Sequence, residues 1–431
     1  MYEETVEGML DFIRCSPTAF HAVENVKNIL RENQFQELSE KDRWKVETGG
    51  KYFVTRNDSS IIAFSVGERI DDYCFKIVAS HSDSPSFKVK ENAEIQVRGK
   101  YTQLNTEGYG GMLCATWFDR PLSVAGRVVM KEAERYRTEL VCVDRDLLLI
   151  PSVAIHMNRE ANEGYHYNKQ VDMLPLFGDG THETGELKRL IAEELHVEET
   201  EICGMDLYLY NRMGASVWGA GKEYISSPRL DDLECAYTSL RGFLQGKDEK
   251  AVNVFACFDN EEVGSGTKQG AGSTFLYDTL CRVNRCLGKD EEDFCRAAAS
   301  GFMVSCDNEH AVHPNHPEKA DVNNCVYMNE GIVVKSHAGQ KYTSDAMSIA
   351  VFKGICEKAG VPVQFFANRS DMAGGSTLGN IVMAQVSMNC VDIGLPQLAM
   401  HSAYESAGVK DCADMIRAIT CFFDSQIEIT D

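Results

Sequence analysis

Apolar residues recur with a helical period near the start of the chain. Residues 6–13 place apolar side chains at i, i+3, i+4 and i+7, and residues 19–30 carry a second apolar stripe. Between them, Ser16-Pro17 is typical of an N-cap followed by proline at the first helical position. Short apolar runs at 51–55 and 60–65 then predict strands. This part of the sequence therefore predicts two helices followed by strands, with a further buried strand at 75–80.

The pattern changes between about residue 93 and residue 225. Short alternating runs separated by glycines replace the longer periodic segments, at 94–98, 122–130, 138–144, 147–150 and 205–210. A single helix is expected near 185–195. Short strands between glycine turns are typical of a barrel or sandwich, so we expect a β-rich unit here.

The last third alternates helices and strands. Helices are predicted around 231–245, 345–359 and 378–386, and strands at 251–258, 301–305, 363–367 and 387–393. Such alternation is typical of an α/β fold with a mixed, largely parallel sheet and helices on both faces. We therefore expect one α/β domain made of residues 1–92 and 226–431, interrupted by a β-rich insertion at 93–225. A length of 431 residues agrees with more than one hydrophobic core.

The charge of the chain narrows its possible partners. The sequence has 65 acidic and 43 basic residues and a net charge of −22. Lys and Arg supply the affinity for phosphate backbones, so nucleic-acid binding is not expected. The longest charge-free stretch, residues 372–391, contains too many glycines and polar side chains to span a bilayer, so no membrane partner is expected either.

The cysteines indicate a reducing compartment. There are 16 of them, without a Cys-x-x-Cys pair, and many lie inside apolar runs, where a free thiol behaves as a small buried side chain. Disulfides are rare in the cytoplasm, so we expect a cytoplasmic protein with reduced thiols.

Metal-binding side chains follow several predicted strands. Open α/β sheets bind ligands at the carboxyl ends of their strands, so these positions are the ones to inspect. The residues found there are His81 and Asp83, the run 259–262 with Glu261 and Glu262, Asp307 followed by His310, His401, and Asp231-Asp232 at a helix start. Imidazole and carboxylate together suit zinc or a similar ion, and so many acids favour two ions.

Seven stretches give the chain a family resemblance over nearly its whole length. They read SPTAFHAV at 16–23, HSDSP at 81–85, TWFDRPL at 116–122, PRLDDL at 228–233, DNEEVGS at 259–265, HPN at 313–315 and PQLAMHS at 396–402. In this order they resemble the aspartyl aminopeptidase family of dinuclear zinc metallopeptidases.

The resemblance implies a role for each residue of the metal site. His81 and Asp307 would hold one ion, Glu262 and His401 the other, and Asp231 would bridge the two, while Asp83 would orient His81. Glu261 would act as general base on a metal-activated water. The free α-amino group of the substrate would bind one ion, which restricts cleavage to the N-terminus. The ions are expected to be zinc, although manganese and cobalt also suit such a site.

The resemblance also implies how substrates and other subunits are recognised. Lys335 would meet an acidic side chain at P1, the N-terminal residue of the substrate. For His310 the residues themselves leave two interpretations open, assistance in substrate binding or pairing with a nearby acid. His156, in the insertion, would reach the site of a neighbouring subunit and help stabilise the oxyanion. The chain would therefore form a homo-oligomer, with dimers building a dodecamer. The remaining histidines, His182 among them, are expected to be structural or surface residues.

Three departures from the family pattern and two alternative functions remain open. Asp232 replaces a common Asn, Glu309 lies in the unusual run 306–310, and residues 112–114 differ after Gly111; none of these is expected to touch a ligand. One alternative function is an aminopeptidase with the same metals and a broad or apolar P1 preference. The other is a non-catalytic metal-binding assembly or cargo protein.

Overall fold

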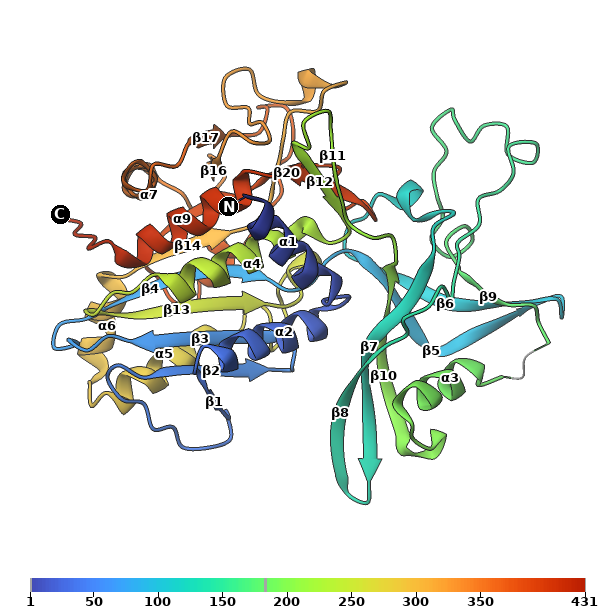
Figure 1. Cartoon of the computed structure of the whole chain (residues 1–431), viewed down its shortest axis with the longest axis horizontal. Helices are drawn as coiled ribbons and strands as arrows, with labels where there is room; N and C mark the ends of the chain where they lie inside the picture. Colours follow the sequence, from blue (N-terminus) through green and yellow to red (C-terminus); the bar gives the residue numbers. More distant parts are fainter. Residues whose placement is uncertain (1, 182–183, 431) are drawn as a thin grey trace. The chain divides into compact units, whose positions relative to one another are not determined.

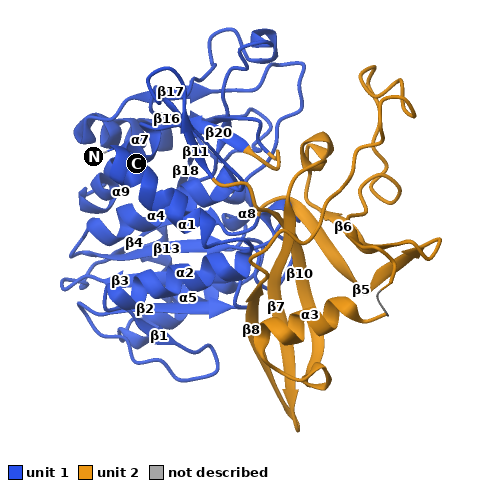
Figure 2. Ribbon diagram, turned by 45° about the vertical axis from the view of Figure 1, so that its right-hand side comes forward, with its two compact units in different colours: residues 1–83, 215–400, 405–431 blue, residues 84–214, 401–404 orange. Residues whose placement is uncertain are grey.

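The structure is a computed structural model that describes residues 2–181 and 184–430, so His182 lies outside the described residues. The chain divides into two compact units (Figure 2). Unit 1 contains Met1–Asp83, Ala215–Met400 and Glu405–Asp431, and unit 2 contains Ser84–Gly214 and His401–Tyr404. The units therefore divide near residues 83 and 214, whereas the sequence predicted 92 and 225. The difference arises because β5 (Ser86–Val97) is one continuous strand of unit 2, while β11 (Ser216–Trp218) and β12 (Tyr224–Ser227) pair within unit 1.

Within the described residues, unit 1 is built on a nine-stranded sheet with the order β1-β2-β3-β13-β4-β14-β18-β16-β17. Its strands are β1 (Gln36–Leu38), β2 (Lys51–Arg56), β3 (Ser60–Val66), β4 (Cys74–His81), β13 (Ala251–Phe258), β14 (Phe302–Cys306), β16 (Ile332–Lys335), β17 (Val363–Phe366) and β18 (Asn389–Gly394). The central strands β13, β4, β14 and β18 run parallel to one another, whereas β3 and β16 pair antiparallel with their inner neighbours. This confirms the predicted mixed, largely parallel sheet.

Helices cover both faces of this sheet (Figure 1). One face packs against α1 (Tyr2–Arg14), α2 (Ala19–Glu32), α4 (Leu230–Gln245), α7 (Ala346–Ala359) and α9 (Asp411–Asp424). The other packs against α5 (Phe275–Cys286), α6 (Glu291–Ala299) and α8 (Leu378–Val382). Strand β13 is almost entirely apolar in sequence because all eight of its residues are buried, and residues 254–258 alternate between the two cores.

A third sheet, in unit 1, was not predicted. Its order is β11-β12-β20-β19-β15, where β20 is Glu405–Gly408, β19 is Pro396–Leu398 and β15 is Glu309–His310. The strands are two to four residues long and come from three distant stretches of the chain. Such short pieces carry no periodic signal, yet this sheet places residues 309–310 and 405 beside the site described below.

In its described residues, unit 2 contains an open six-stranded antiparallel sheet with the order β8-β7-β10-β5-β6-β9. The strands besides β5 are β6 (Tyr101–Tyr109), β7 (Leu122–Glu132), β8 (Arg135–Cys142), β9 (Leu176–Gly178) and β10 (Ile202–Asn211). The prediction of a barrel or sandwich is wrong. A helix, α3 (Glu186–Leu195), buries its apolar stripe against the sheet, so no second sheet is needed to cover that side.

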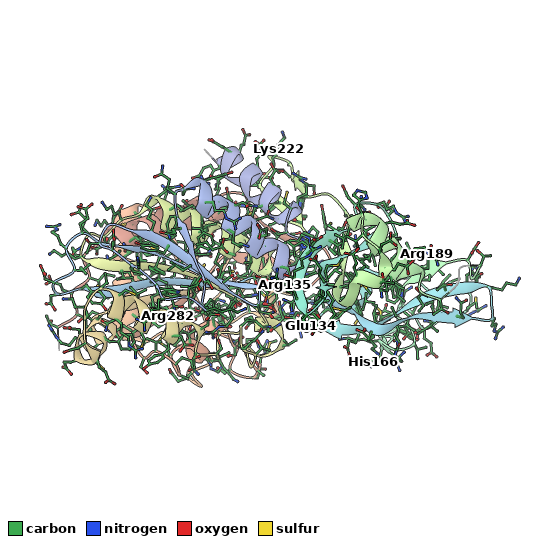
Figure 3. The ribbon with its side chains drawn as sticks, turned by 90° about the horizontal axis from the view of Figure 1, so that it is seen from below. Glu134, Arg135, His166, Arg189, Lys222 and Arg282 are labelled. Atoms are coloured by element: carbon green, nitrogen blue, oxygen red, sulfur yellow. The ribbon has the colours of Figure 1, made fainter. Side chains whose placement is uncertain are left out.

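Arg282 holds the irregular loop between β1 and β2 against helix α5. Arg282, labelled in Figure 3, is a residue of α5. Its Cζ atom lies 3.8 Å from the ring centroid of Trp44. Its guanidinium also donates to the backbone carbonyl of Glu40 at 2.9 Å. The loop between β1 and β2 is thereby held against α5 by a cation–π contact together with a charge-assisted hydrogen bond.

Among the described residues, no helix is both long enough and apolar enough to cross a bilayer. All 16 cysteines are free thiols.

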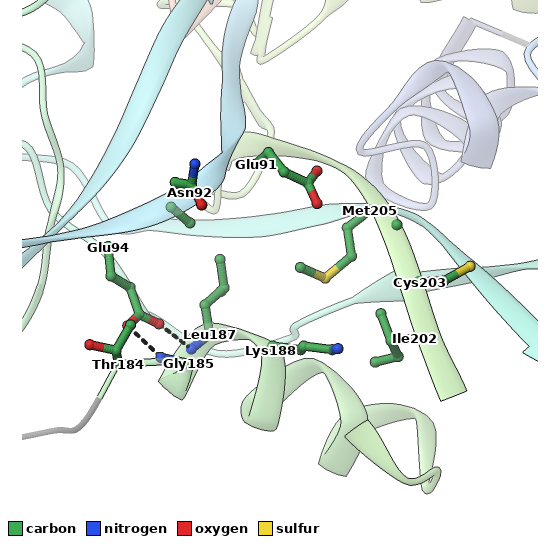
Figure 4. Close-up of a pocket in the computed structure, with 12 residues that line it drawn as sticks. Glu91, Asn92, Glu94, Thr184, Gly185, Leu187, Lys188, Ile202, Cys203 and Met205 are labelled. Atoms are coloured by element: carbon green, nitrogen blue, oxygen red, sulfur yellow. Dashed lines mark hydrogen bonds between the residues drawn. The ribbon is translucent and has the colours of Figure 1, made fainter. Parts of the chain in front are cut away.

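Glu94 caps the first turn of α3 from another strand. Its carboxylate accepts hydrogen bonds from the backbone N–H groups of Gly185 and Leu187, both at 2.8 Å (Figure 4). It lines a pocket of about 280 Å³ between β5, α3 and β10. Free N–H groups and the helix dipole both favour a carboxylate at this position, so Glu94 should stabilise α3.

We expect Glu94→Ala to weaken α3 by about 1 kcal/mol, because two helix N–H groups lose their acceptor. Hydrogen–deuterium exchange of the α3 amides should become about fivefold faster, while exchange in unit 1 should not change. Glu91→Ala is the control, since Glu91 lines the same pocket and is not the acceptor of these amides (Figure 4). Equal acceleration in both variants would contradict the capping role.

Candidate metal centre

The chemistry-bearing side chains of unit 1 meet at one edge of the large sheet. Strands β13, β4 and β14 are neighbours and parallel, so their carboxyl ends lie side by side (Figure 1). His81 is the last residue of β4, Asp307 directly follows β14, and Glu261 and Glu262 follow β13 by three and four residues. Asp231 enters from the first turn of α4.

His81 lies at the centre of a group of carboxylates. Its Nε2 atom is 3.4 Å from Asp231 Oδ1 and 3.6 Å from Asp307 Oδ1. The imidazole is buried, with a relative exposure of 1%. Burial alone would lower the pKa of His81, but the surrounding carboxylates, Asp232 foremost, outweigh it and raise the pKa well above its ordinary value. The site thus attracts positive charge strongly.

Asp83 joins the histidine to the turn that follows β13. Its Oδ1 and Oδ2 accept hydrogen bonds from the backbone N–H groups of Glu261 and Glu262, at 3.1 and 3.2 Å. Its Oδ1 is also 3.4 Å from Nδ1 of His81, and its backbone carbonyl is 3.1 Å from the same nitrogen. The side chain therefore positions His81 and the glutamate turn together.

Asp232 belongs to the cluster, which corrects the expectation that the departing residues touch no ligand. Its Oδ2 accepts a hydrogen bond from the backbone N–H of His81 at 2.9 Å. The residue is fully buried, and in the described part of the chain its Oδ1 has no hydrogen-bond partner. The Asp231–Asp232 peptide bond is cis. The adjacent acid pair was visible in the sequence, but its burial was not.

Glu261 and Glu262 lie close enough to His81 for their ligand atoms to share a metal ion. Burial raises the pKa of the Glu261 carboxyl, and the negative charges of Asp307 and Asp83 add to this effect. Burial likewise raises the pKa of Glu262, with Asp231 adding to it. Cations at this site would lower both pKa values again and keep the carboxylates ionised.

The donor set fits a divalent metal ion. Ligand atoms of His81, Asp231, Asp232 and Asp307 all lie within 4.8 Å of one another, as do those of His81, Glu261 and Glu262. Buried carboxylates at this density repel each other unless cations compensate them, and a mixture of imidazole and carboxylate suits zinc.

Lys335 and His310 lie at the border of this cluster. Lys335, the last residue of β16, is buried, and its Nζ is 3.9 Å from Asp307 Oδ2. The same ammonium donates a hydrogen bond to the backbone carbonyl of Asn308 at 2.9 Å. His310 is an exposed residue of β15, and its backbone N–H donates to Glu309 Oε1 at 2.8 Å. Sequence reasoning missed Glu309 as part of this border.

Two predicted residues belong to unit 2. His156 is exposed, in the loop between β8 and β9. His401 directly follows Met400, the last residue of a unit 1 segment, and begins the short segment His401–Tyr404. Its backbone carbonyl accepts a hydrogen bond from the N–H of Leu113 at 3.0 Å, and its φ is 64°.

Comparison with known proteins decides the family. Residues 12–423 match the model of the aminopeptidase I zinc metalloprotease family, M18. The chain belongs to the M18 family. A relative in Clostridium acetobutylicum, named "Probable M18 family aminopeptidase 2", is 48% identical over 95% of this chain and 96% of its own length. The family resemblance seen in the sequence is thereby confirmed, and this M18 chain is a metal-dependent aminopeptidase.

Solved structures agree with this assignment. A chain in the structure of the Ape4 and Nbr1 complex is 36% identical and superimposes with a TM-score of 0.94, covering 98% of this chain and 86% of that one. The structure of the S. cerevisiae mApe1 dodecamer gives 26% identity and a TM-score of 0.86, covering 98% and 97%. The zinc-peptidase type of fold predicted from the sequence is confirmed.

Gly394 lies in close contact with the backbone of Asp307. It ends β18, and a Cβ there would overlap the backbone carbonyl of Asp307. We expect Gly394→Ala to displace Asp307 and to lower the metal content of zinc-loaded protein at least severalfold, as measured by plasma mass spectrometry. Gly354→Ala on α7 is the control, because a Cβ there meets no atom within 4 Å. Full metal content in Gly394→Ala would contradict this role of the close contact.

Proposed function

We propose that this M18 aminopeptidase uses two divalent metal ions to remove acidic residues from the N-termini of peptides. The proposal rests on the buried cluster of side chains at the carboxyl ends of β4, β13 and β14. In it, one imidazole and several carboxylates converge within metal-ligand distance. That donor set has little use other than holding cations.

The geometry of unit 1 and the family resemblance support this choice of ligands. His81 and Asp307 would hold one ion, and Asp231, 3.4 Å from His81 Nε2, would bridge to the second. Glu262 and His401 would complete the second position. Zinc is the expected ion, as the family description states, although manganese and cobalt also suit carboxylate-rich sites.

Glu261 would move the protons of the reaction. Metal ions at this site would lower the pKa of a water molecule and polarise the scissile carbonyl. The Glu261 carboxylate would accept the proton of the attacking water and then deliver it to the departing amine. Asp83 supports this role, because its hydrogen bond to the backbone N–H of Glu261 fixes the turn on which the base stands.

Lys335 is the proposed contact for an acidic P1 side chain, and His310 is proposed to assist substrate binding. The Lys335 ammonium lies 3.9 Å from Asp307 at the border of the cluster, so a substrate held at the metals would direct its first side chain toward it. One observation favours the broader P1 preference as a second candidate, since the ammonium of Lys335 already has carboxylate neighbours.

We further propose that the chain works as a homo-oligomer, with dimers building a dodecamer. A solved relative is described as a dodecamer, and large apolar side chains are exposed around His156, with Met157 82% exposed. Such side chains are typical of a surface that another subunit covers. His156 would reach the neighbouring site and stabilise the oxyanion. The cytoplasm is the proposed compartment, on the cysteine content of the sequence.

Metal removal tests the proposed chemistry. Purified protein should release N-terminal Glu and Asp from peptides, lose this activity to a chelator, and regain it with zinc, manganese or cobalt. Release rates for P1 Glu, Asp, Gln, Leu and Lys, each measured with and without chelator, separate acidic from broad specificity. Hydrolysis that is insensitive to the chelator would exclude the mechanism, and metal binding without hydrolysis would favour the assembly-protein alternative.

Glu261→Gln should separate the base from the metal ligands. The variant should bind the same amount of metal but turn over about 10²- to 10⁴-fold more slowly, because the amide cannot accept the water proton. Metal content and kcat are the measurements, and Glu291→Gln, on the exposed start of α6, is the control. If Glu261→Gln lost its metal instead, Glu261 would be a ligand rather than the base.

A further inference from the structure

The cation proposed to recognise acidic substrates already has a carboxylate partner. The Nζ atom of Lys335 lies 3.7 Å from Glu309 Oε2, in addition to its contacts with Asp307 and the Asn308 carbonyl. Both members of the Lys335–Glu309 pair are almost completely buried, at 2% and 1% exposure. The ammonium of Lys335 is therefore already paired with a buried carboxylate.

Glu309 is held in place by groups other than Lys335. Its Oε1 accepts the backbone N–H of His310 at 2.8 Å, and its Oε2 accepts the hydroxyl of Tyr342 at 3.2 Å. The ring of Tyr342 also lies 5.3 Å from Lys335 Nζ, as a cation–π partner. Because both oxygens have donors of their own, the carboxylate stays beside Lys335 whether or not a substrate is bound.

The charges around Lys335 disfavour a further carboxylate. If Asp307 serves a metal ion, Glu309 still compensates the ammonium one to one. An acidic P1 side chain that approached Lys335 would then meet Glu309 at close range in a dry site, where repulsion between like charges is poorly screened. A neutral side chain of the same shape would not meet this repulsion.

We propose that Glu309 is a specificity-determining residue: it occupies Lys335 and holds the preference for acidic P1 side chains well below what Lys335 alone would give. This inference rests on the proposed aminopeptidase function. It adds that the carboxylate of Glu309 competes with an acidic P1 side chain for Lys335. It also predicts that neutral hydrogen-bonding side chains, such as that of Gln, are accepted at P1.

The experiment compares two nearly isosteric substrates on metal-loaded enzyme. kcat/KM is measured for peptides or amides with P1 Glu and P1 Gln, in the native chain, Glu309→Gln, Lys335→Met and the double variant. The readout is the Glu-to-Gln ratio of kcat/KM, which does not depend on how much of each preparation is correctly folded or metal-loaded. We expect Glu309→Gln to raise this ratio about tenfold or more, and we expect no such rise in the Lys335→Met background.

A control variant and the possible contrary results distinguish a failure of the Glu309 role from a failure of the proposed aminopeptidase function. Asp411→Asn is the control: this carboxylate is equally buried and accepts two backbone hydrogen bonds, from Asn329 and Gly331, so the ratio should stay unchanged. An unchanged or lower ratio in Glu309→Gln would overturn the inference, as would an equal rise in the Lys335→Met background. Failure of the native chain to cleave any of these substrates would instead overturn the proposed function.

Discussion

The structure depends on burying several carboxylates around one imidazole. Asp231, Asp232 and Asp307 all approach His81 at the carboxyl edge of the large sheet, where solvent cannot separate their charges. Carboxylates buried in this way destabilise a fold unless cations or hydrogen-bond donors compensate them. Several neighbouring segments supply this compensation, through backbone N–H groups and the ammonium of Lys335.

Backbone amides supply part of the compensation. Asp83 accepts two N–H groups from the turn after β13, Asp232 accepts that of His81, and Glu405 accepts that of Asp231 at 3.1 Å. These bonds connect β4, β13, α4 and the small third sheet. These hydrogen bonds hold the backbone segments that carry the proposed metal ligands. Lys335 adds a full positive charge to the site, and the neighbouring carboxylate of Glu309 compensates this charge.

Much of the fold was predictable because buried central strands have an unambiguous sequence. Strand β13 has the predicted bounds, since a run of eight buried residues between polar turns has few other interpretations. The unit boundaries, the third sheet and the single open sheet of unit 2 were not predictable. They depend on which short strands find each other across long distances in the chain, and strands of two to four residues leave no period to detect.

The sequence by itself determined the family, the α/β class and the candidate ligands, because those residues follow strong strand signals in a recognisable order. Only the tertiary structure decided what surrounds them. Nothing in the chain order shows that Asp232 bonds the backbone of His81, or that Glu309 and Tyr342 meet Lys335. Burial and distance set the strength of charge–charge interactions, and both are properties of the folded chain.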